Sequence, residues 1–220
     1  MSQDAAEESY FGLPSFWFNK SDTESDDIFY EQPRMVAHID AATMAALTDF
    51  YRDFLPDGGV ILDLMSSWLS HLPEEASYTQ VTGLGMNAEE LAANPQLSEW
   101  CVHNLNENPE LPFADSFFDR VLIVVSIQYL EQPVDVLRSA LRTLKPGGEI
   151  AIAMSHRLFP TKAIAAFQGM ERDDKVKLVG YCLQQSGFDG ITFHDQSPLG
   201  ADPLWIMSAS KPNGENANET

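Results

Sequence analysis

Polar side chains directly follow several short apolar runs of this chain. The run at 60–64 contains Asp63 and continues into Met65, Ser66 and Ser67. Such runs are typical of strands buried in a parallel sheet, and ligands of these sheets bind beyond the carboxyl ends of the strands. Because a buried carboxylate is costly unless it is paired, Asp63 is a candidate ligand-binding residue, with loop bracing or helix capping as the alternative. The candidates that follow the other runs are Gly83, Gly85, Met86, Asn104, Leu105, Asn106, Ser126, Gln128, Tyr129, His156 and Arg157.

The elements that position these residues alternate between strands and helices, and two strands end the series. This order predicts an α/β fold, a doubly wound, Rossmann-like sheet of seven mostly parallel strands with an antiparallel strand at the C-terminal end. We expect a helical N-terminal extension at 1–57, the sheet domain at 58–211 and a disordered tail at 212–220. Apolar runs predict strands at 60–64, 80–84, 100–103, 120–125, 149–154, 190–195 and 204–210, and helical periodicity predicts helices at 38–55, 88–93, 133–144, 161–167 and 174–185.

The composition argues against several classes of function. The 220 residues carry 33 Asp and Glu against 13 Lys and Arg, a formal net charge of −20. A surface of this charge repels nucleic-acid phosphates and anionic lipids, so we expect neither nucleic acid nor a membrane as a partner. Cys101 and Cys182 form neither a disulfide framework nor a paired metal-ligand motif, so we expect no metal. The polar, acidic N-terminus is unlike a signal peptide, which predicts a cytoplasmic protein.

Three motifs, in order, resemble those of class I S-adenosylmethionine-dependent methyltransferases. The segment 62–67, Leu-Asp-Leu-Met-Ser-Ser, stands where this family has hydrophobic-Asp-hydrophobic-Gly-x-Gly. Residues 111–119, Leu-Pro-Phe-Ala-Asp-Ser-Phe-Phe-Asp, are similar to the family's segment before its fourth strand. Residues 141–148, Leu-Arg-Thr-Leu-Lys-Pro-Gly-Gly, are similar to its turn before the fifth strand. The resemblance covers about 58–211, and the first loop is similar to that of a plant and cyanobacterial subgroup of type 11-like methyltransferases.

The resemblance implies S-adenosylmethionine as the cofactor, S-adenosylhomocysteine as its product and a small-molecule methyl acceptor as the partner. It implies that Asp63 faces the ammonium group of the cofactor. It also implies that Asn104 and Asn106 contact the adenine edge, although turn capping is an equal alternative for both. The other residues that it assigns to the cofactor site are Met65, Ser66, Ser67, Gly83, Gly85, Met86, Leu105, Ser126 and Gln128.

The chain departs from the family pattern at two places. Side chains replace glycines in the loop 65–67, and Gly85 stands where the family usually has an acid that binds the ribose hydroxyls. Asn87 or a backbone carbonyl then has to accept those hydrogen bonds, each worth about 0.5–1.5 kcal/mol. Trp68 and His71 follow the loop, and we expect them on a short helix.

The residues for catalysis are less clearly marked. Methyl transfer needs mainly in-line positioning of the acceptor, because the cofactor carries the activated group, and a general base is required only for a protonated acceptor. Arg34 and His38 are four residues apart and would share one helix face, with a salt bridge to Glu31 or Asp40 as the alternative. N-terminal extensions typically cover the acceptor site in this family, so His38 and Arg34 are candidate catalytic residues, together with Tyr129, which follows the fourth strand. The implied acceptor-binding residues are Tyr30, Arg34, His38, Tyr129, His156 and Arg157, the last two being on an exposed loop in the alternative interpretation.

Three hypotheses follow. The first is a small-molecule methyltransferase that uses S-adenosylmethionine. The second, suggested by the loop 65–67 and by Gly85, is a non-catalytic or regulatory protein on the same scaffold. The third, an NAD(P)-dependent oxidoreductase, is weaker because no Gly-x-Gly-x-x-Gly motif follows the first strand.

Overall fold

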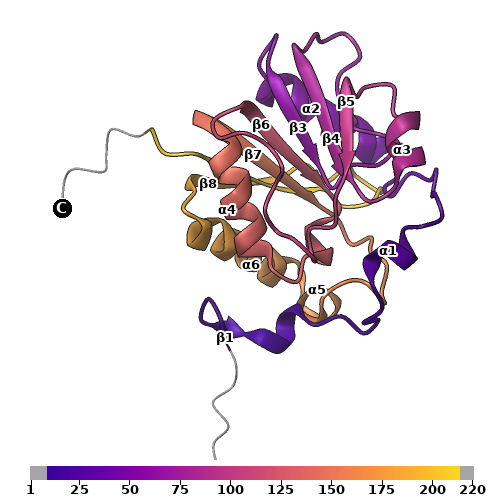
Figure 1. Ribbon diagram of the computed structural model, residues 1–220, viewed down its shortest axis with the longest axis vertical. Helices are drawn as coiled ribbons and strands as arrows, with labels where there is room; N and C mark the ends of the chain where they lie inside the picture. Colours follow the sequence, from indigo (N-terminus) through magenta and orange to yellow (C-terminus); the bar gives the residue numbers. More distant parts are fainter. Residues whose placement is uncertain (1–8, 214–220) are drawn as a thin grey trace, which may run out of the picture.

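A seven-stranded sheet forms the centre of the structure, a computed structural model that describes residues 9–213 (Figure 1). The strand order is β5-β4-β3-β6-β7-β9-β8, with β9 antiparallel to both of its neighbours. The order reverses at β3, which lies between β4 and β6, so the crevice expected for ligands is at the carboxyl end of β3. The predicted fold class is confirmed. The strands are β3 (Val60–Leu64), β4 (Gln80–Gly85), β5 (Glu99–Val102), β6 (Phe118–Val124), β7 (Leu144–Met154), β8 (Asp189–Asp195) and β9 (Trp205–Ser210).

Helices cover both faces of the sheet because alternate strand residues point to opposite sides. On one face, Leu62 of β3 joins a cluster with apolar residues of α4 (Pro133–Thr143) and α6 (Arg172–Ser186), which lie side by side in Figure 1. On the other face, Ile61 joins a cluster with α2 (Ala41–Phe54). The remaining helical elements are η1 (Ser15–Phe18), α1 (Asp26–Phe29), α3 (Ala88–Ala93), η2 (Ile127–Tyr129) and α5 (Ala165–Gly169).

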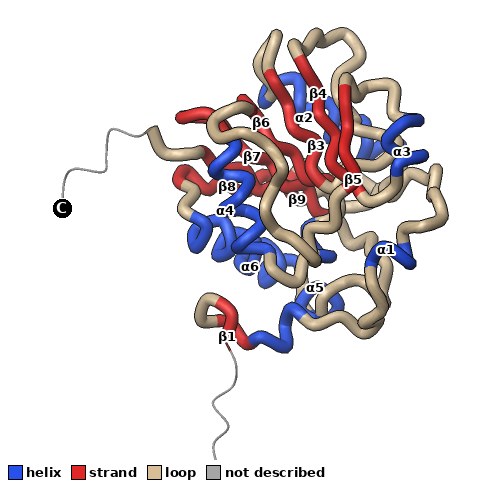
Figure 2. Tube along the Cα trace, in the orientation of Figure 1, coloured by secondary structure: helices blue, strands red, loops and turns tan. Residues whose placement is uncertain are grey.

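Two local helix predictions are wrong. No helix forms in the described segment 65–79, so Trp68 and His71 lie in the long loop between β3 and β4 (Figure 2). The segment from Arg34 to His38 is not helical either. The backbone N–H of Arg34 donates a hydrogen bond to the Glu90 side chain and not to a helical carbonyl. The helix predicted from residue 38 begins at Ala41, where the Asp40 side chain accepts a hydrogen bond from the Thr43 N–H, as an N-cap residue does.

The N-terminal segment is tied to the main domain along its described length. A small hairpin of β1 (Ser9–Tyr10) and β2 (Leu13–Pro14) packs on α4, where the Tyr10 hydroxyl donates to Asp135 and accepts from the Val134 N–H. Residues 20–26 are held by buried ion pairs, and residues 26–39 then run along the carboxyl edge of the sheet. Residues 1–8 and 214–220, which include the polar N-terminus and most of the predicted tail, lie outside the described residues. Across 9–213, no helix is long and apolar enough to cross a bilayer.

Candidate active site

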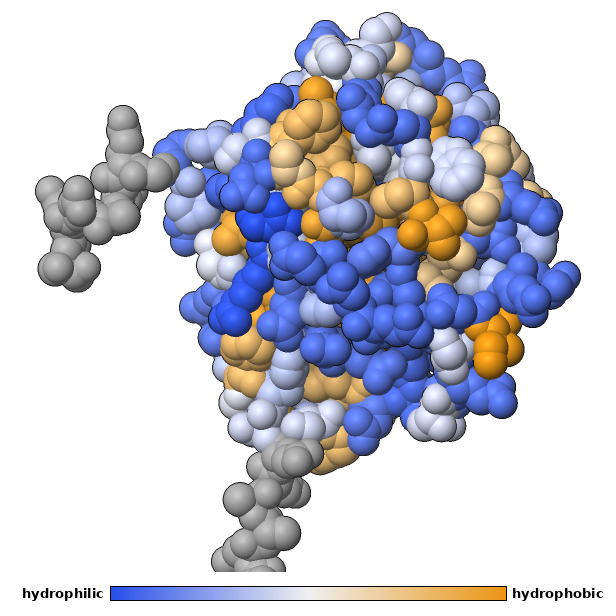
Figure 3. All heavy atoms as spheres, in the orientation of Figure 1, coloured by the Kyte–Doolittle hydropathy of each residue, from blue (hydrophilic) through white to orange (hydrophobic). Residues whose placement is uncertain are grey.

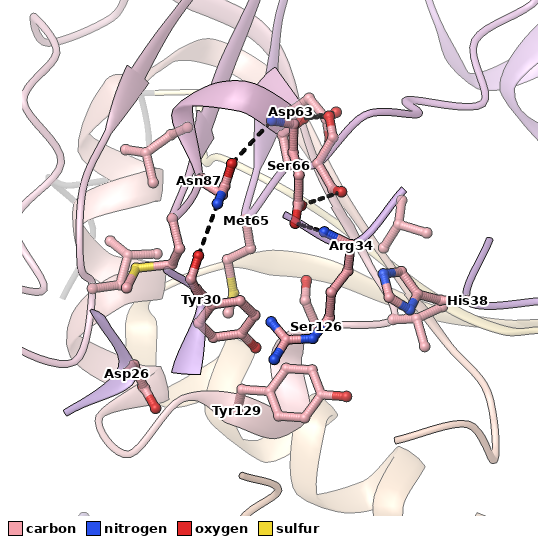
Figure 4. A pocket seen from close by; sticks show the side chains of 18 of the residues that line it. Asp26, Tyr30, Arg34, His38, Asp63, Met65, Ser66, Asn87, Ser126 and Tyr129 are labelled. Atoms are coloured by element: carbon pink, nitrogen blue, oxygen red, sulfur yellow. Dashed lines mark hydrogen bonds between the residues drawn. The ribbon is translucent and has the colours of Figure 1, made fainter. Parts of the chain in front are cut away.

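A pocket opens at the carboxyl ends of β3, β4, β5 and β6, and the N-terminal segment forms its other wall (Figure 4). Most of the predicted site residues meet here, although they come from five separate segments. The predicted residues that line it are Tyr30, Arg34, His38, Asp63, Met65, Ser66, Ser67, Gly85, Met86, Asn104, Leu105, Asn106, Ser126 and Tyr129. Polar or aromatic lining residues that were not predicted are Asp26, His71, Glu90, His103 and Phe159.

The Asp63 carboxylate lies at the bottom of this pocket and is only 3% exposed. Ser66 Oγ and Ser70 Oγ both donate to its Oδ2 atom at 2.6 Å, and no hydrogen bond from the described residues reaches Oδ1. Burial raises the pKa of Asp63 to about 6, while the two hydroxyl groups oppose part of that effect. Because no Lys or Arg of the described chain pairs with it, the site favours a cationic ligand group beside Oδ1.

The loop after Asp63 keeps a backbone shape that favours glycine. Met65 stands at the first glycine position of the family motif and has φ +60°, in the left-handed region. The next residue, Ser66, donates its N–H to the Leu84 carbonyl at 2.7 Å, which draws the loop against β4. A Cβ atom at Gly85 would lie far inside contact distance of the Ser66 carbonyl oxygen. The two departures from the family pattern are therefore coupled, since this loop leaves no room for a side chain at position 85.

Asn87 is not free to replace the missing acid. Its Oδ1 caps α3 by accepting from the N–H groups of Glu89 and Glu90, and its Nδ2 donates to the carbonyls of Tyr30 and Glu31. The acid that faces the pocket beside Gly85 is Glu90, which is 7% exposed. The sequence signal for this residue was its place in the first turn of the helix after β4, where an acid also interacts well with the helix dipole.

Glu90 connects the cofactor corner to the N-terminal segment. One carboxylate oxygen accepts from Ser67 Oγ and the other from the Arg34 backbone N–H, both at 2.6 Å. The Trp68 indole N–H donates to the Val36 carbonyl at 3.1 Å. These contacts hold residues 30–38 against the loop 65–68, so one wall of the pocket depends on both segments.

Asn104 and Asn106 line the pocket, but their side chains brace loops. Asn106 Nδ2 donates to Asp26 at 2.7 Å and to the Tyr129 carbonyl at 2.9 Å. Asn104 Oδ1 accepts from the Asn106 N–H, which is an Asx turn, and its Nδ2 lies 3.4 Å from Asp27. The structure thus shows the turn-bracing role that was the alternative for these two residues.

The aromatic and titratable residues of the acceptor side gather around Phe159. The His38 ring lies edge-on to Phe159 with centroids 5.6 Å apart, and Tyr129 is nearly parallel to it at 5.9 Å. His38 remains exposed on one side, and the partial burial of its ring lowers the pKa of the imidazole. Glu90 opposes this effect, and Arg34 adds a smaller effect in the same direction as burial. Burial raises the pKa of Tyr129. At neutral pH His38 is therefore a neutral imidazole that can accept a proton, whereas Tyr129 keeps its proton.

A second histidine, His71, lies in the same pocket. Burial lowers its pKa to about 4, and the nearby His38 adds to that effect. His71 also has φ +58°, and Thr48 Oγ1 donates to its carbonyl at 2.9 Å. This hydrogen bond from α2 ties the loop 65–79 to the helix.

Gly83 and Gln128 do not line the pocket. A Cβ atom at Gly83 would collide with the side chain of Leu97, so this glycine makes room for packing between β4 and the chain that follows α3. The buried Gln128 side chain donates to the carbonyls of Val125 and Arg157 at 2.8 and 3.3 Å. Both residues support the site without facing a ligand.

His156 and Arg157 also lie outside the pocket. Both contact the buried Asp202 carboxylate, His156 Nε2 at 3.1 Å and Arg157 Nε at 3.0 Å. Asp202 in turn accepts from the Asp40 backbone N–H and donates its own N–H to the Asp40 carboxylate. His156 and Arg157 therefore stabilise the start of α2 through Asp202. Their position outside the pocket agrees with the alternative interpretation, in which they lie on an exposed loop.

The comparisons with known proteins point in one direction. Residues 64–152 match the model of a family described as a methyltransferase domain. The chain is 30% identical over 159 residues to 27-O-demethylrifamycin SV methyltransferase of Amycolatopsis mediterranei (strain S699). That match covers 63% of this chain and 56% of the relative, so the chain spans just over half of the length of the relative. The matched segment is thus similar to a methyltransferase domain, and the sheet has the fold of the class I S-adenosylmethionine-dependent methyltransferases.

Solved structures of other proteins share the fold. Phosphoethanolamine N-methyltransferase 2 of Haemonchus contortus, in complex with S-adenosylmethionine, gives a TM-score of 0.55 at 16% identity, covering 78% of this chain and 52% of that one. The [4+2]-cyclase SpnF gives a TM-score of 0.59 at 19% identity, covering 76% of this chain and 81% of that one. At these identities the likeness concerns the fold alone.

The residues of this pocket fit S-adenosylmethionine, the cofactor of the class I methyltransferases. The Asp63 carboxylate offers a buried acceptor for an ammonium group. The Ser126 hydroxyl is also buried and has no hydrogen-bond partner among the described residues, although it lines the pocket. Since a buried polar atom without a partner costs about 1–3 kcal/mol, Ser126 is suited to bond a ligand. Within the same residues, no group of three or more His, Cys, Asp or Glu side chains is arranged to hold a metal ion.

Proposed function

We propose that this protein is an S-adenosylmethionine-dependent methyltransferase that acts on a small-molecule acceptor. The observation that carries the proposal is the buried Asp63 carboxylate, whose Oδ1 atom is left for a cationic ligand group at the switch point of the sheet. The 27-O-demethylrifamycin SV methyltransferase of Amycolatopsis mediterranei, which acts by its name on a small molecule, supports the acceptor class. When bound, the cofactor supplies an activated methyl group.

The residues of the chain would divide the remaining work between them. We assign the ammonium group of the cofactor to Asp63. We assign the ribose hydroxyls to Glu90, because position 85 has no side chain, Asn87 is occupied, and each Glu90 carboxylate oxygen can accept a second hydrogen bond beside the one it already has. The Ser126 hydroxyl is available for a further hydrogen bond. Tyr30, Tyr129 and Phe159 exclude water from the acceptor side of the pocket.

Direct titration tests the proposal. Isothermal calorimetry of the folded protein with S-adenosylmethionine and S-adenosylhomocysteine should show binding of both. If neither ligand gives a heat of binding, and the circular dichroism spectrum shows that the protein is folded, the proposal is contradicted. Incubation with cofactor labelled in the methyl group, together with a panel of small hydroxylated and amino compounds, then tests the acceptor class. Transfer of label to macromolecules alone would contradict a small-molecule acceptor.

His38 is the candidate general base for an acceptor that must lose a proton. With the acceptor found in that panel, kcat of the wild type should fall as the pH decreases through a value below 6.5, because only the neutral imidazole accepts a proton. His38→Asn should lower kcat by about 10²–10⁴-fold and remove this limb of the pH profile. The affinity for S-adenosylhomocysteine serves as the control and should stay unchanged; an unaltered profile would exclude His38 as the base.

A second candidate function is a non-catalytic ligand-binding protein. The contact between the Ser66 carbonyl and Gly85 favours this second function. The Ser66 carbonyl occupies the space that the side chain of a ribose-binding acid at position 85 would need. Tight binding of S-adenosylhomocysteine without label transfer to any compound would favour this second function.

A further inference from the structure

The Arg34 guanidinium lies in the pocket without a carboxylate partner. It rests on the Phe29 ring, with 4.2 Å between Cζ and the ring centroid, and the Tyr30 and Phe159 centroids are 5.8 and 5.7 Å away. Its one hydrogen bond within the described residues is long, 3.5 Å from Nη1 to the Gln32 carbonyl. Because a guanidinium has five N–H donors, most of them remain for a ligand. Figure 4 shows the group pointing between the Tyr30 and Tyr129 rings.

Two acids of the same pocket, Asp26 and Glu90, are already engaged by other groups. Asp26 is held between two buried lysines, and both carboxylate oxygens of Glu90 accept hydrogen bonds. Arg34 bonds the Glu90 carboxylate through its backbone N–H and not through its guanidinium. The positive charge of the guanidinium therefore has no ion-pair partner among the described residues. In a chain with a net charge of −20, a cation left in this position creates a local attraction for an anion.

Flat rings from three separate segments surround the guanidinium. Phe159, from the connection after β7, contacts Phe29 at 5.4 Å and the nearly parallel Tyr129 ring at 5.9 Å. The Phe159 N–H donates to the Tyr129 hydroxyl at 2.9 Å, which fixes the two rings relative to each other. Such walls bury a planar apolar group and add ring-to-ring attraction of about 0.5–1.5 kcal/mol per pair.

We propose that Arg34 and this ring cluster bind a methyl acceptor that carries a carboxylate group on an aromatic ring. The inference rests on the proposed function, since it names the acceptor class of the same site. The guanidinium can donate two parallel hydrogen bonds to a carboxylate, and the rings of Tyr129 and Phe159 pack on the body of the ligand. Arg34 also offsets the repulsion that an anion would meet from Asp63 and from the acidic surface.

The test uses benzoate as the charged probe and benzamide as its neutral analogue. Binding to the wild-type protein is followed by NMR saturation transfer and by tryptophan fluorescence, with and without S-adenosylhomocysteine. We expect benzoate to bind at millimolar concentration and benzamide to bind at least fivefold more weakly. Arg34→Met should weaken benzoate at least tenfold and leave benzamide unchanged, because only the charged hydrogen bonds are lost.

Arg138 provides a matched control. It also rests on an aromatic ring, 4.4 Å from the Phe11 centroid, and has no carboxylate partner within the described residues, but it lies on α4 outside the pocket. Arg138→Met removes the same charge and should leave benzoate affinity unchanged. Equal effects of the two variants, equal binding of benzoate and benzamide, or no binding of benzoate to the wild type would each overturn the proposal.

Two further titrations separate this inference from the proposed function and from the carboxylate of the cofactor itself. If the wild type binds neither S-adenosylmethionine nor S-adenosylhomocysteine, the proposed function fails independently of the benzoate result. Arg34→Met should bind S-adenosylhomocysteine as the wild type does. If it loses that affinity but keeps its affinity for 5′-methylthioadenosine, which lacks the amino-acid part, Arg34 binds the cofactor and the acceptor assignment is overturned.

Discussion

Asp63 shows how one residue can favour ligand binding and disfavour folding. The pKa of its carboxyl group is raised on folding from 3.8 to about 6, because burial outweighs the two serine hydrogen bonds. The neutral acid is favoured in the folded state, so the contribution to stability is present below pH 3.8 and is lost as the pH rises through about 6. At neutral pH the ionised group destabilises the free protein by about 3 kcal/mol. A bound ammonium group would offset that cost.

Asp63→Asn should therefore stabilise the free protein and weaken cofactor binding. An amide oxygen can accept from Ser66 and Ser70 as Oδ2 does, while the NH₂ group would face the ammonium of the ligand. We expect a gain of about 1–3 kcal/mol in the free energy of unfolding at pH 7.5, and at least a tenfold loss of S-adenosylmethionine affinity. Urea denaturation and calorimetry measure the two quantities.

The pH dependence provides the check on this mechanism. At pH 4 the wild-type carboxyl group is largely neutral, so the advantage of the variant should shrink. The control is Asp53→Asn on the exposed side of α2, which should change stability by less than about 0.5 kcal/mol at either pH. A gain that is equal at pH 4 and pH 7.5 would rule out desolvation of the charge as the cause.

At the scale of elements, the loop 65–79 and strand β4 act together. The loop reaches β4 through the Ser66 N–H bond to Leu84, and the positive φ of Met65 sets that path. Because the Ser66 carbonyl then faces Gly85 at very short range, the shape of one element restricts the sequence of the other. The backbone of the described segment 65–79 is not helical, since Met65 and His71 both have positive φ values, which a right-handed helix does not contain.

Gly85→Asp should therefore fail to restore a ribose-binding acid. The side chain must displace the Ser66 backbone, so we expect a loss of about 1–3 kcal/mol in the free energy of unfolding and weaker binding of S-adenosylhomocysteine. In a Met65→Gly background the loop can move, and the loss should be smaller by at least about 0.5 kcal/mol. Gly169→Asp is the control, because nothing lies within 4 Å of a Cβ there. Additive effects of Gly85→Asp and Met65→Gly would refute the coupling.

A second pair of elements is joined by buried charges. Lys162, before α5, has a side chain 1% exposed and contacts Asp26 at 3.3 Å, Asp22 at 3.1 Å and the Glu24 carbonyl at 2.7 Å. Lys20 contacts Asp26 from the other side at 2.6 Å. Because removing one member of a buried pair leaves the other charge uncompensated, this cluster holds the N-terminal segment against the pocket.

Lys162→Met should release that segment. We expect a loss of about 3–5 kcal/mol in the free energy of unfolding. Relative to the wild type, the rate of hydrogen exchange should increase more in residues 20–38 than in the central strands. Lys177→Met removes an exposed lysine that pairs with Asp174 on α6, and it should cost less than about 1 kcal/mol. Unchanged exchange in 20–38 would show that the ion pairs do not hold this segment.

For the whole molecule, the dominant feature is the net charge of −20. Figure 3 shows a mostly hydrophilic face with scattered hydrophobic areas. Repulsion among so many acids destabilises the compact state, and salt screens it over a Debye length of about 8–10 Å at physiological strength. The same field attracts cations and repels anions, which is why a cation such as Arg34 is needed if the ligand is an anion.

Raising sodium chloride from 20 to 300 mM should therefore increase Tm. A gain of about 1 kcal/mol corresponds to about 2–4 °C for a domain of this size. Differential scanning calorimetry measures it, and potassium chloride should act in the same way, because screening does not depend on the identity of the ion. A decrease of Tm with both salts would show that favourable ion pairs outweigh the repulsion.

The sequence by itself determined the strands, the fold class and the place of Asp63 in the pocket. These depend on local patterns, such as the apolar runs at 60–64 and 80–84, which lie in consecutive residues. Loops were less well predicted, because the segment 65–79 is shaped by bonds to β4, α2 and Asn94 rather than by its own propensity.

Only the tertiary structure decided which candidates share the pocket. His156 and Arg157 lie outside the pocket because both contact Asp202, which is distant in the sequence. Glu90 of α3 and Phe159, which follows β7, line the pocket instead. Contacts between distant residues depend on how elements pack, and a single sequence carries no local signal for them. The same reason explains Gly85, whose need for a bare backbone exists only because the Ser66 carbonyl lies against it.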